Sequence, residues 1–382
     1  MSKILVLGAG MVGSAMAIDL AKRHRVTLAD VNPDRLNYIQ EKCDSINILP
    51  LDVRDQNKLV SSIKDFDLII SAVPGFLGFE TLKKIITAKK NVVDISFFPE
   101  NALDLNEFAT FNGVTAIVDC GVAPGMDNII LGFYNEQLKL TDFECLVGGL
   151  PKVKKWPFSY KAPFSPVDVI EEYTRPARYV ENGHVIIREP LTDVEFLEFD
   201  KLGTLEAFNS DGLRSILFTM PHIKNMKEKT LRYPGHAEYV RVLKESGFFN
   251  KNKILLNGTE ISPLDFTSKI LFDEWKLAED EEEITTMRVT LKGENEKGEI
   301  EKIVYNLYDE YCAETKTSSM ARTTGYTATA VANMVLEGLF TEKGIFPPEL
   351  IGKHEVCFKY ILNYLKERNI HYVKTYIKEV YL

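Results

Sequence analysis

Three glycines near the start of the chain have the spacing of a dinucleotide-binding turn. Gly8, Gly10 and Gly13 stand in the stretch GAGMVG, directly after an apolar run. In this spacing the first glycine makes the turn, the second lets a pyrophosphate approach the backbone, and the third lets the next helix pack against the strand. The N–H groups at the start of that helix, around Met11 and Val12, attract phosphates. The predicted chemistry is therefore the binding of a nicotinamide dinucleotide.

An acidic residue indicates which dinucleotide to expect. Asp30 ends the second apolar run, where a carboxylate can accept hydrogen bonds from the ribose hydroxyls and would repel a 2′-phosphate. Arg35 could in principle meet a phosphate. It follows Pro33, however, so we place it on the next helix with its side chain in solvent. NAD is the expected cofactor, and NADP is the less favoured alternative.

Alternating strands and helices must position these residues. Such alternation predicts an α/β fold with a Rossmann-type, doubly wound parallel sheet. Ligands of such sheets lie outside the carboxyl ends of the strands. We expect Asp52 and Val53 near the adenine, and Ala72, Val73 and Pro74 under the ribose and nicotinamide. The predicted strands lie at 3–7, 26–29, 46–53, 68–73, 92–95 and 114–118.

The pattern changes at DCGVAPGMDNII, which precedes an apolar helix predicted at 128–138. Longer alternating strands follow, including a hairpin predicted from 285–291 and 300–308. From about residue 317 the chain reads as helical, and these helices are expected to pack back on the nucleotide domain. We predict an NAD-binding domain at 1–121, completed by 317–382. An inserted α/β domain at 122–316 would carry a mostly antiparallel sheet, bind the substrate and support dimerisation.

The composition is that of an ordinary globular protein. The 382 residues are 45% hydrophobic and 26% charged, and the formal net charge is −9. This balance gives no reason to expect a nucleic acid or a membrane surface as partner. No window reaches the ~20 apolar residues of a membrane span, and the chain enters a strand at once without a signal peptide. A cytoplasmic protein is expected.

Cysteine and histidine spacings indicate no metal. The five cysteines are scattered, odd in number and without a CxxC pair, and the six histidines form no HExxH or paired pattern. We therefore expect reduced, mostly buried thiols and no metal site.

The run DCGVAPGMDN brings out a resemblance to the saccharopine dehydrogenase family, and within it to the lysine 6-dehydrogenase branch. The matching stretches extend from Lys3 to about Glu349 and so cover most of the chain. They include VLGAGMVG, DCGVAPGMDNI, VGGLP, SYKAPFSPVDVIEEYTRPA, FDKLGTLEAFNSDG, KTLRYPGHAEYVRVL, NGTEISPLD, ARTTGYTATAVANMV and GIFPPE.

The resemblance implies hydride transfer to NAD from a carbon that bears an amine, followed by hydrolysis of the imine. An amino-acid substrate then needs a base for its ammonium and a guanidinium for its carboxylate. His236 and Arg232 flank a Pro-Gly turn and are candidates for base and carboxylate anchor. Tyr160 and Lys161 form a second candidate pair, with Lys161 as an alternative base. Arg322 is a further candidate carboxylate anchor.

Plainer interpretations stand beside these roles. His236 could only orient water or serve as a structural hydrogen-bond donor. Lys161 could be exposed, and Arg322 could cap a helix or pair with an acid. Asp119 could hold the substrate amine, or it could only satisfy N–H groups of its loop.

The substrate is left between two amines. Oxidation of L-lysine at its ε-carbon, with release of ammonia and an aldehyde, is the leading hypothesis. Lys161 favours a saccharopine-oxidising enzyme instead, because a cation beside the substrate amine would repel free lysine. A catalytically silent NAD-binding protein is the hypothesis from another class. A homo-oligomer is expected, with the antiparallel sheet as its surface.

Overall fold

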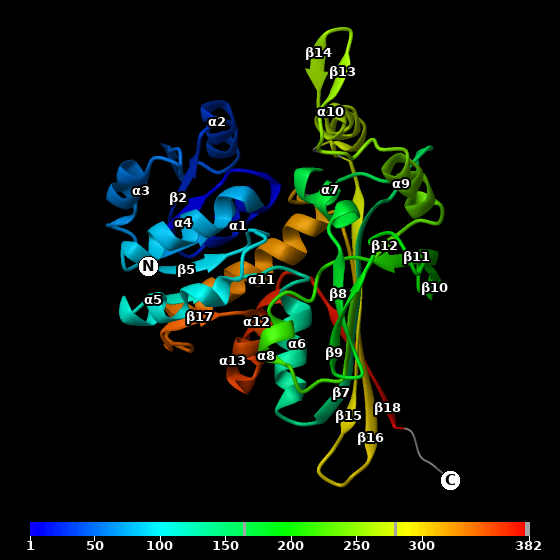
Figure 1. Cartoon of the computed structure of the whole chain (residues 1–382). Helices are drawn as coiled ribbons and strands as arrows, with labels where there is room; N and C mark the ends of the chain where they lie inside the picture. Colours follow the sequence, from blue (N-terminus) through cyan, green and yellow to red (C-terminus); the bar gives the residue numbers. More distant parts are fainter. Residues whose placement is uncertain (163–165, 279–280, 379–382) are drawn as a thin grey trace.

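The computed structural model describes residues 1–162, 166–278 and 281–378. Two sheets dominate it. A parallel sheet lies on one side, and a second, longer sheet stands beside it (Figure 1). Helices fill the space between the two sheets and cover the outer face of the first. Within the described residues, no helix is both long enough and apolar enough to cross a membrane.

The first sheet is the predicted Rossmann-type sheet, and its seven strands are all parallel. They run in the order β17-β6-β5-β4-β1-β2-β3. Their interiors are short apolar runs because both faces are covered by helices, as parallel sheets require. The strands are β1 (Lys3–Leu7), β2 (Arg25–Asp30), β3 (Asn47–Pro50), β4 (Leu68–Ser71), β5 (Asn91–Asp94), β6 (Thr115–Ile117) and β17 (Gly344–Phe346).

Alternate residues of β1 face two different cores. Ile4 and Val6 pack with α1, α2 and α11, while Leu5 and Leu7 pack with α3, α4 and α5. This period of two puts an apolar side chain on each face of the strand. The helices are α1 (Met11–Ala21), α2 (Pro33–Lys42), α3 (Gln56–Ile63), α4 (Gly75–Thr87), α5 (Asn106–Phe111) and α11 (Ser319–Leu336), with a 3-10 turn at Ala102–Leu105.

The C-terminal part of the chain returns to the first sheet and then leaves it. Helix α11 packs against α1, and β17 pairs with β6. Two more helices, α12 (Pro348–Gly352) and α13 (Glu355–Lys366), follow. The last strand, β18 (Tyr372–Lys378), pairs instead with β16 of the second sheet. Residues 317–382 therefore do not all belong to the nucleotide domain, because the unpaired edge of β16 takes up this strand.

The second sheet has nine strands and is mostly antiparallel, as predicted. Its main path is β10-β11-β12-β7-β15-β16-β18, with β8 and β9 attached at β12. The predicted hairpin is present as β15 and β16, while β7 and β12 run parallel. The strands are β7 (Lys139–Pro151), β8 (Ala177–Glu181), β9 (His184–Arg188), β10 (Glu195–Phe199), β11 (Gly203–Asn209), β12 (Asn225–Arg232), β15 (Glu283–Glu294), β16 (Ile300–Glu310) and β18.

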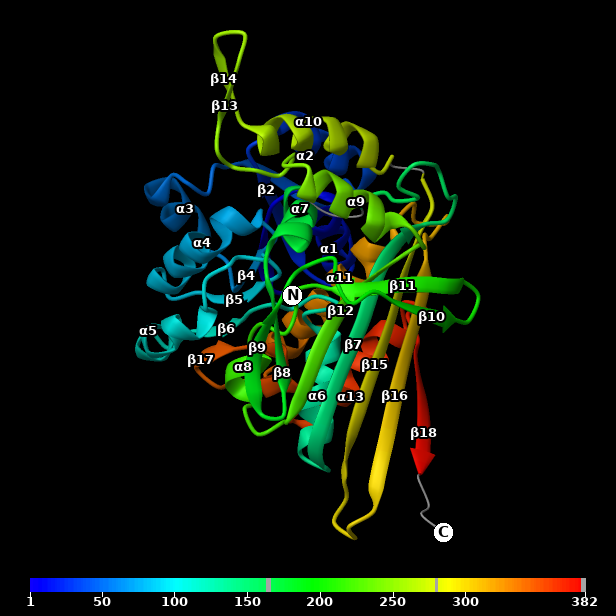
Figure 2. The same cartoon turned by 45° about the vertical axis from the view of Figure 1, so that its right-hand side comes forward.

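Helices of the second domain surround the upper end of this sheet and its inner face (Figure 2). A small two-stranded hairpin of β13 (Ile254–Leu256) and β14 (Thr259–Ile261) projects beyond α10. The helices are α6 (Met126–Asn135), α7 (Pro166–Thr174), α8 (Ile216–Thr219), α9 (His236–Glu245) and α10 (Pro263–Trp275).

Candidate active site

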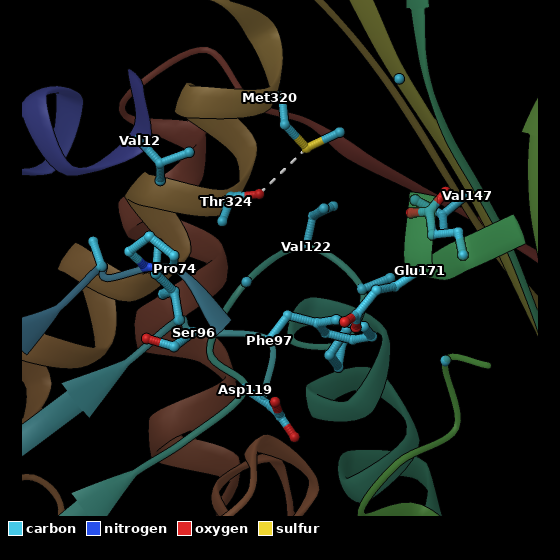
Figure 3. Close-up of a pocket in the computed structure, with 18 of the residues that line it drawn as sticks. Val12, Pro74, Ser96, Phe97, Asp119, Val122, Val147, Glu171, Met320 and Thr324 are labelled. Carbon is cyan, nitrogen blue, oxygen red and sulfur yellow. Dashed lines mark hydrogen bonds between the residues drawn. The ribbon is translucent and has the colours of Figure 1, made fainter. Parts of the chain in front are cut away.

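One cavity, with a volume of about 550 Å³, joins the two domains. Figure 3 shows Val12 and Pro74 of the nucleotide domain on one side and Val147 and Glu171 of the second domain on the other. Thr324 of α11 donates a hydrogen bond to the Met320 sulfur at 3.4 Å along another wall. We refer to the wall from the nucleotide domain as the cofactor side and to the wall from the second domain as the substrate side, after the roles expected of the two domains.

The glycine turn has the geometry that its spacing predicts. Gly8 has φ +105°, and a Cβ there would lie 2.4 Å from the Ala72 carbonyl oxygen. A Cβ on Gly13 would lie 2.0 Å from the Gly8 carbonyl oxygen, so the start of α1 touches the turn. A Cβ on Gly10 would meet nothing within 4 Å, so this backbone is open to the cavity. All three glycines line the cavity, together with Met11 and Val12.

Asp30 lies at the end of β2 and lines the same cavity. Its carboxylate accepts hydrogen bonds from the Ala9 N–H at 2.7 Å and the Asn32 N–H at 2.8 Å. Arg35 is also here, because its Nε donates to the Ala9 carbonyl at 2.9 Å. The expectation of a solvated Arg35 is therefore wrong. The first turn of α2 brings the guanidinium back to Ala9 in the glycine turn, whose N–H binds Asp30.

The expected adenine and nicotinamide neighbours divide into two groups. Ala72, Val73 and Pro74 line the cavity at the end of β4. Asp52 and Val53 follow β3 and lie outside the lining. Asp52 forms an ion pair with Arg54 at 2.6 Å. Hydrogen bonds from Arg54 lower the pKa of Asp52 to about 2.

Asp119 reaches the cavity, but an arginine already holds it. The residue has φ +53° just after β6 and is buried. Both carboxylate oxygens accept from Nε of Arg214 at 2.9 Å. Arg214 in turn lies over the Phe97 ring, 4.4 Å from its centroid. Asp119 is therefore placed to shape the cavity wall, with its charge compensated from the second domain.

Arg232 lies at the end of β12 and lines the substrate side of the cavity. Its guanidinium donates to the Glu172 carboxylate at 2.9 Å and lies over the Tyr160 ring, 4.4 Å from the centroid. Its Nε has no hydrogen-bond partner among the described residues. Tyr160 is buried beneath it and acts as its aromatic support. Of the three predicted substrate-binding residues, Arg232, Tyr160 and Arg322, Arg232 is the one that lines the cavity, and its Nε–H is the donor without a partner among the described residues.

His236 lies behind this wall and not in it. The side chain is buried, with Nε2 2.9 Å from the Tyr173 hydroxyl and Nδ1 3.0 Å from the Phe158 carbonyl. The carbonyl can only accept, so Nδ1 carries the proton and Nε2 accepts from Tyr173. Burial and the charge of Arg232 lower the pKa of His236 to about 3. This geometry suits a support for the aromatic residues beneath Arg232.

The structure does not bring Lys161 and Arg322 to the cavity. Lys161 donates from Nζ to the Glu274 carbonyl at 2.6 Å, beside α10. Arg322 forms an ion pair with Asp309 at 3.1 Å and also donates to the Arg368 carbonyl. Arg322 therefore pairs with an acid, which is the plainer interpretation weighed for it, and Lys161 is partly exposed and binds the Glu274 carbonyl beside α10.

Several charged residues of the substrate side were missed from the sequence. Glu171 and Glu172 come from α7, Arg175 directly follows that helix, Asp211 lies in the loop before α8, and Glu228 comes from β12. A signal for Glu228 existed. It stands two and four residues before Thr230 and Arg232, so the three share one face of the strand. All three line the cavity.

Comparison with known proteins agrees with this architecture. Residues 4–117 match the saccharopine dehydrogenase NADP binding domain, and residues 121–370 match the saccharopine dehydrogenase C-terminal domain. The chain belongs to the saccharopine dehydrogenase family. The first of these domains contains the glycine turn, so the cofactor side of the cavity is an NAD(P)-binding site. The second family domain contributes the substrate side of the cavity.

The named relatives differ in the share of their length that aligns with this chain. The bovine mitochondrial alpha-aminoadipic semialdehyde synthase is 27% identical over 281 residues, which are 69% of this chain and 30% of that protein. The chain thus spans about a third of this longer relative. Carboxyaminopropylagmatine dehydrogenase of Synechocystis is 22% identical over 91% of this chain and 92% of its own length.

Two solved structures share the fold. Saccharopine dehydrogenase (L-Glu forming) of Saccharomyces cerevisiae superposes with a TM-score of 0.81 at 20% identity, over 99% of this chain and 100% of the yeast chain. Homospermidine synthase of Legionella pneumophila, solved with NAD, gives 0.67 at 14% identity, over 98% and 91% of the two chains. At these identities the likeness establishes the fold of the family and leaves the substrate to the residues of this cavity.

Proposed function

We propose that this protein is an NAD(P)-dependent oxidoreductase that oxidises the amine of an amino-acid substrate, with L-lysine at its ε-carbon as the first candidate. Bound cofactor would supply the hydride acceptor, held by the glycine turn and Asp30. The single observation that carries the proposal is the shared cavity. It joins this turn to a wall with the Arg232 guanidinium and the Glu228 carboxyl, which match the two charged ends of an amino acid.

The charges of the substrate side favour lysine. Arg232 is the candidate anchor for the α-carboxylate, and its Nε has no hydrogen-bond partner in the part of the chain that the structure describes. Arg232 shares its charge with Glu172, and Arg214 and Arg178 pair with Asp119 and Asp211, so little net positive charge remains for additional carboxylates. Glu228 is left as the acid that can face an ammonium. Lys161 gives no reason against lysine, because its ammonium binds the Glu274 carbonyl outside the cavity.

Saccharopine oxidation is the second candidate. It is supported by the family to which the chain belongs and by the names of relatives such as the yeast saccharopine dehydrogenase. Saccharopine carries more carboxylates than lysine does, so it would need guanidiniums beyond Arg232. Arg175 lines the same cavity and would have to give up its pairing with Glu171 to serve.

For the cofactor we propose NAD. The Asp30 carboxylate lies where the ribose hydroxyls of a dinucleotide are bound in this fold, and it would repel a 2′-phosphate. Arg35 lies at the same end and supports NADP as the alternative.

The test is cofactor reduction by the purified chain, with lysine and saccharopine supplied separately and with NAD and NADP compared for each. We expect reduced nicotinamide and free ammonia with lysine, and little turnover with saccharopine. Turnover with saccharopine alone would transfer the assignment to the second candidate. Binding of cofactor without oxidation of any amine would instead support a silent nucleotide-binding protein.

A further inference from the structure

The carboxyl group of Glu228 is the unusual feature of the substrate side. The residue lies on β12, is only 5% exposed and lines the cavity. Its Oε2 has no hydrogen-bond partner within the described part of the chain. Gly212 makes room for it, because a Cβ at that position would lie 1.9 Å from Oε1. A buried carboxyl without a partner is costly, so such groups point to a ligand or to proton chemistry.

The neighbouring acids differ from Glu228 in having a cation each. Arg214 binds Asp119 at 2.9 Å, and Arg178 binds Asp211 at 2.9 Å. Glu172 is bound by Arg232 at 2.9 Å in the same wall. Among the described acids of the substrate side, Glu228 is thus the one whose charge would be uncompensated, and a substrate ammonium would compensate it.

Two further protonatable groups lie behind Glu228. One carboxyl oxygen each of Asp127 and Glu228 and the sulfur of Cys145 lie within 4.8 Å of one another, and all three residues are buried. Asp127 belongs to the first turn of α6, and its Oδ1 accepts from the Gly125 N–H at 2.9 Å. Its Oδ2, like Oε2 of Glu228, has no partner among the described residues. Two neighbouring carboxyls in such a place cannot both be ionised without a cation.

Charged groups on every side act on the protonation of this cluster. Burial raises the pKa of Glu228 well above its usual range. The charges of Asp127, Asp211 and Glu172 raise it further, while Arg214 opposes them. Burial also raises the pKa of Asp127 to about 7, and the Glu349 carboxylate adds to this effect. The thiol of Cys145 stays protonated for the same reason of burial.

We propose that Glu228 is the catalytic proton acceptor of this cavity, with Asp127 as the positioning group behind it. The proposal rests on the proposed amine oxidation. A substrate ammonium beside Glu228 opposes the effect of burial and favours the ionised carboxylate. The carboxylate then takes a proton from the ammonium, so an N–H bond breaks, an O–H bond forms and the nitrogen regains its lone pair. Bound nicotinamide would accept the hydrogen of the adjacent carbon together with both electrons of its C–H bond, while the nitrogen lone pair forms the C=N bond. The amine would thereby be oxidised and the cofactor reduced, with the proton held by Glu228.

The experiment compares the holoprotein with its Glu228→Gln variant across pH, following reduction of the cofactor by the amine that the wild type oxidises. We expect turnover to fall about 10²- to 10⁴-fold near neutral pH, the usual worth of a positioned base. The deficit should shrink as pH approaches ~10.4, where the free amine arrives already deprotonated. Glu228→Asp keeps the acid but withdraws it by one methylene, and it should retain part of the activity. Affinity for the reduced cofactor should not change.

Glu144→Gln is the matched control. Glu144 lies on the neighbouring strand β7, pairs with Lys227 at 2.8 Å and does not line the cavity. The turnover of the Glu144→Gln variant should therefore equal that of the wild type. Equal rates for wild type and Glu228→Gln, or a deficit that is the same at every pH, would overturn the proposal. If Glu228→Gln does not fold, full activity in Glu228→Asp would overturn it as well. A wild-type protein that binds cofactor but oxidises no amine would refute the proposed function, and this proposal with it.

Discussion

We expect Asp30 to select NAD over NADP, and one substitution tests this expectation. The carboxylate accepts a hydrogen bond from the Ala9 N–H in the glycine turn, and Arg35 donates to the carbonyl of the same residue. Asp30→Ser would remove the repulsion of a 2′-phosphate and leave the guanidinium. We expect the ratio of kcat/KM for NADP to that for NAD to rise about tenfold or more, equivalent to ~1.4 kcal/mol. Asp34→Ser, on the exposed first turn of α2, is the control. An unchanged ratio in Asp30→Ser would remove Asp30 from cofactor selection.

His236 should affect stability and not the chemistry. Its pKa is lowered to about 3 by burial and by Arg232, below the ~6.5 of an unfolded chain. The folded state therefore resists protonation. This contribution to stability is fully present above pH ~6.5 and is lost as pH falls toward 3, at up to ~1.4 kcal/mol per pH unit.

His236→Gln should flatten this slope in urea unfolding and cost ~1–3 kcal/mol at neutral pH, because the Tyr173 hydroxyl and the Phe158 carbonyl lose an ideal partner. The pH profile of turnover should keep its shape. If the variant instead loses an inflection that the wild-type pH profile shows, His236 takes part in proton transfer in spite of its burial, and the prediction is wrong.

Among the elements, three helices meet at one buried carboxylate. Asp19 of α1 accepts hydrogen bonds from Thr329 of α11 at 2.8 Å, Tyr364 of α13 at 2.7 Å and Arg368 at 2.9 Å. Burial acts to raise the pKa of Asp19, but the charge and hydrogen bonds of Arg368 outweigh it and the pKa is lowered. The contribution of this group to stability is therefore present above pH ~3.8 and is lost below it.

Asp19→Ala should cost ~3–5 kcal/mol of unfolding free energy, because it leaves the Arg368 guanidinium, whose side chain is only 11% exposed, without its partner. It should also weaken cofactor binding, since α1 begins at the glycine turn. Lys22→Ala is the control. It removes the exposed partner of the same carboxylate at 3.2 Å and should cost less than ~1 kcal/mol. Equal losses in the two variants would show that the buried pair does not hold the helices.

At this scale the sequence indicated some elements well and others not at all. Six of the seven strands of the first sheet and the β15–β16 hairpin were predictable because their period and turns are local, whereas β17 was missed because its three residues pair with the distant β6. Strand β18 was not, because its partner β16 is more than sixty residues away and only the assembled edge selects it. The directions of Lys161 and Arg322 were equally out of reach, since their motifs say nothing about which neighbour each cation finds. Glu228 could have been found from its two-residue spacing to Thr230 and Arg232.

For the whole molecule, the expected homo-oligomer stays a prediction. The second sheet presents a face opposite α6 and α13 with partly exposed polar side chains, among them Arg288, Thr290 and Lys292. We expect sedimentation of the purified chain to give a mass of at least two protomers, with this face as the contact. Arg288→Glu together with Lys292→Glu would then shift the mass toward one protomer. A monomer at all concentrations for the wild type would contradict the prediction.

The order of the elements along the chain affects how the protein can fold during translation. Helix α1 is covered by α11, and β6 gains its outer neighbour only with β17. At ~5–20 residues per second, roughly 300 residues and ~15–60 seconds separate the emergence of α1 from that of α11. During this time the nascent nucleotide domain shows an apolar helix face and an unpaired sheet edge. Chaperones that hold such surfaces should therefore matter most for this protein before translation ends, because its first helix is among the last to be covered.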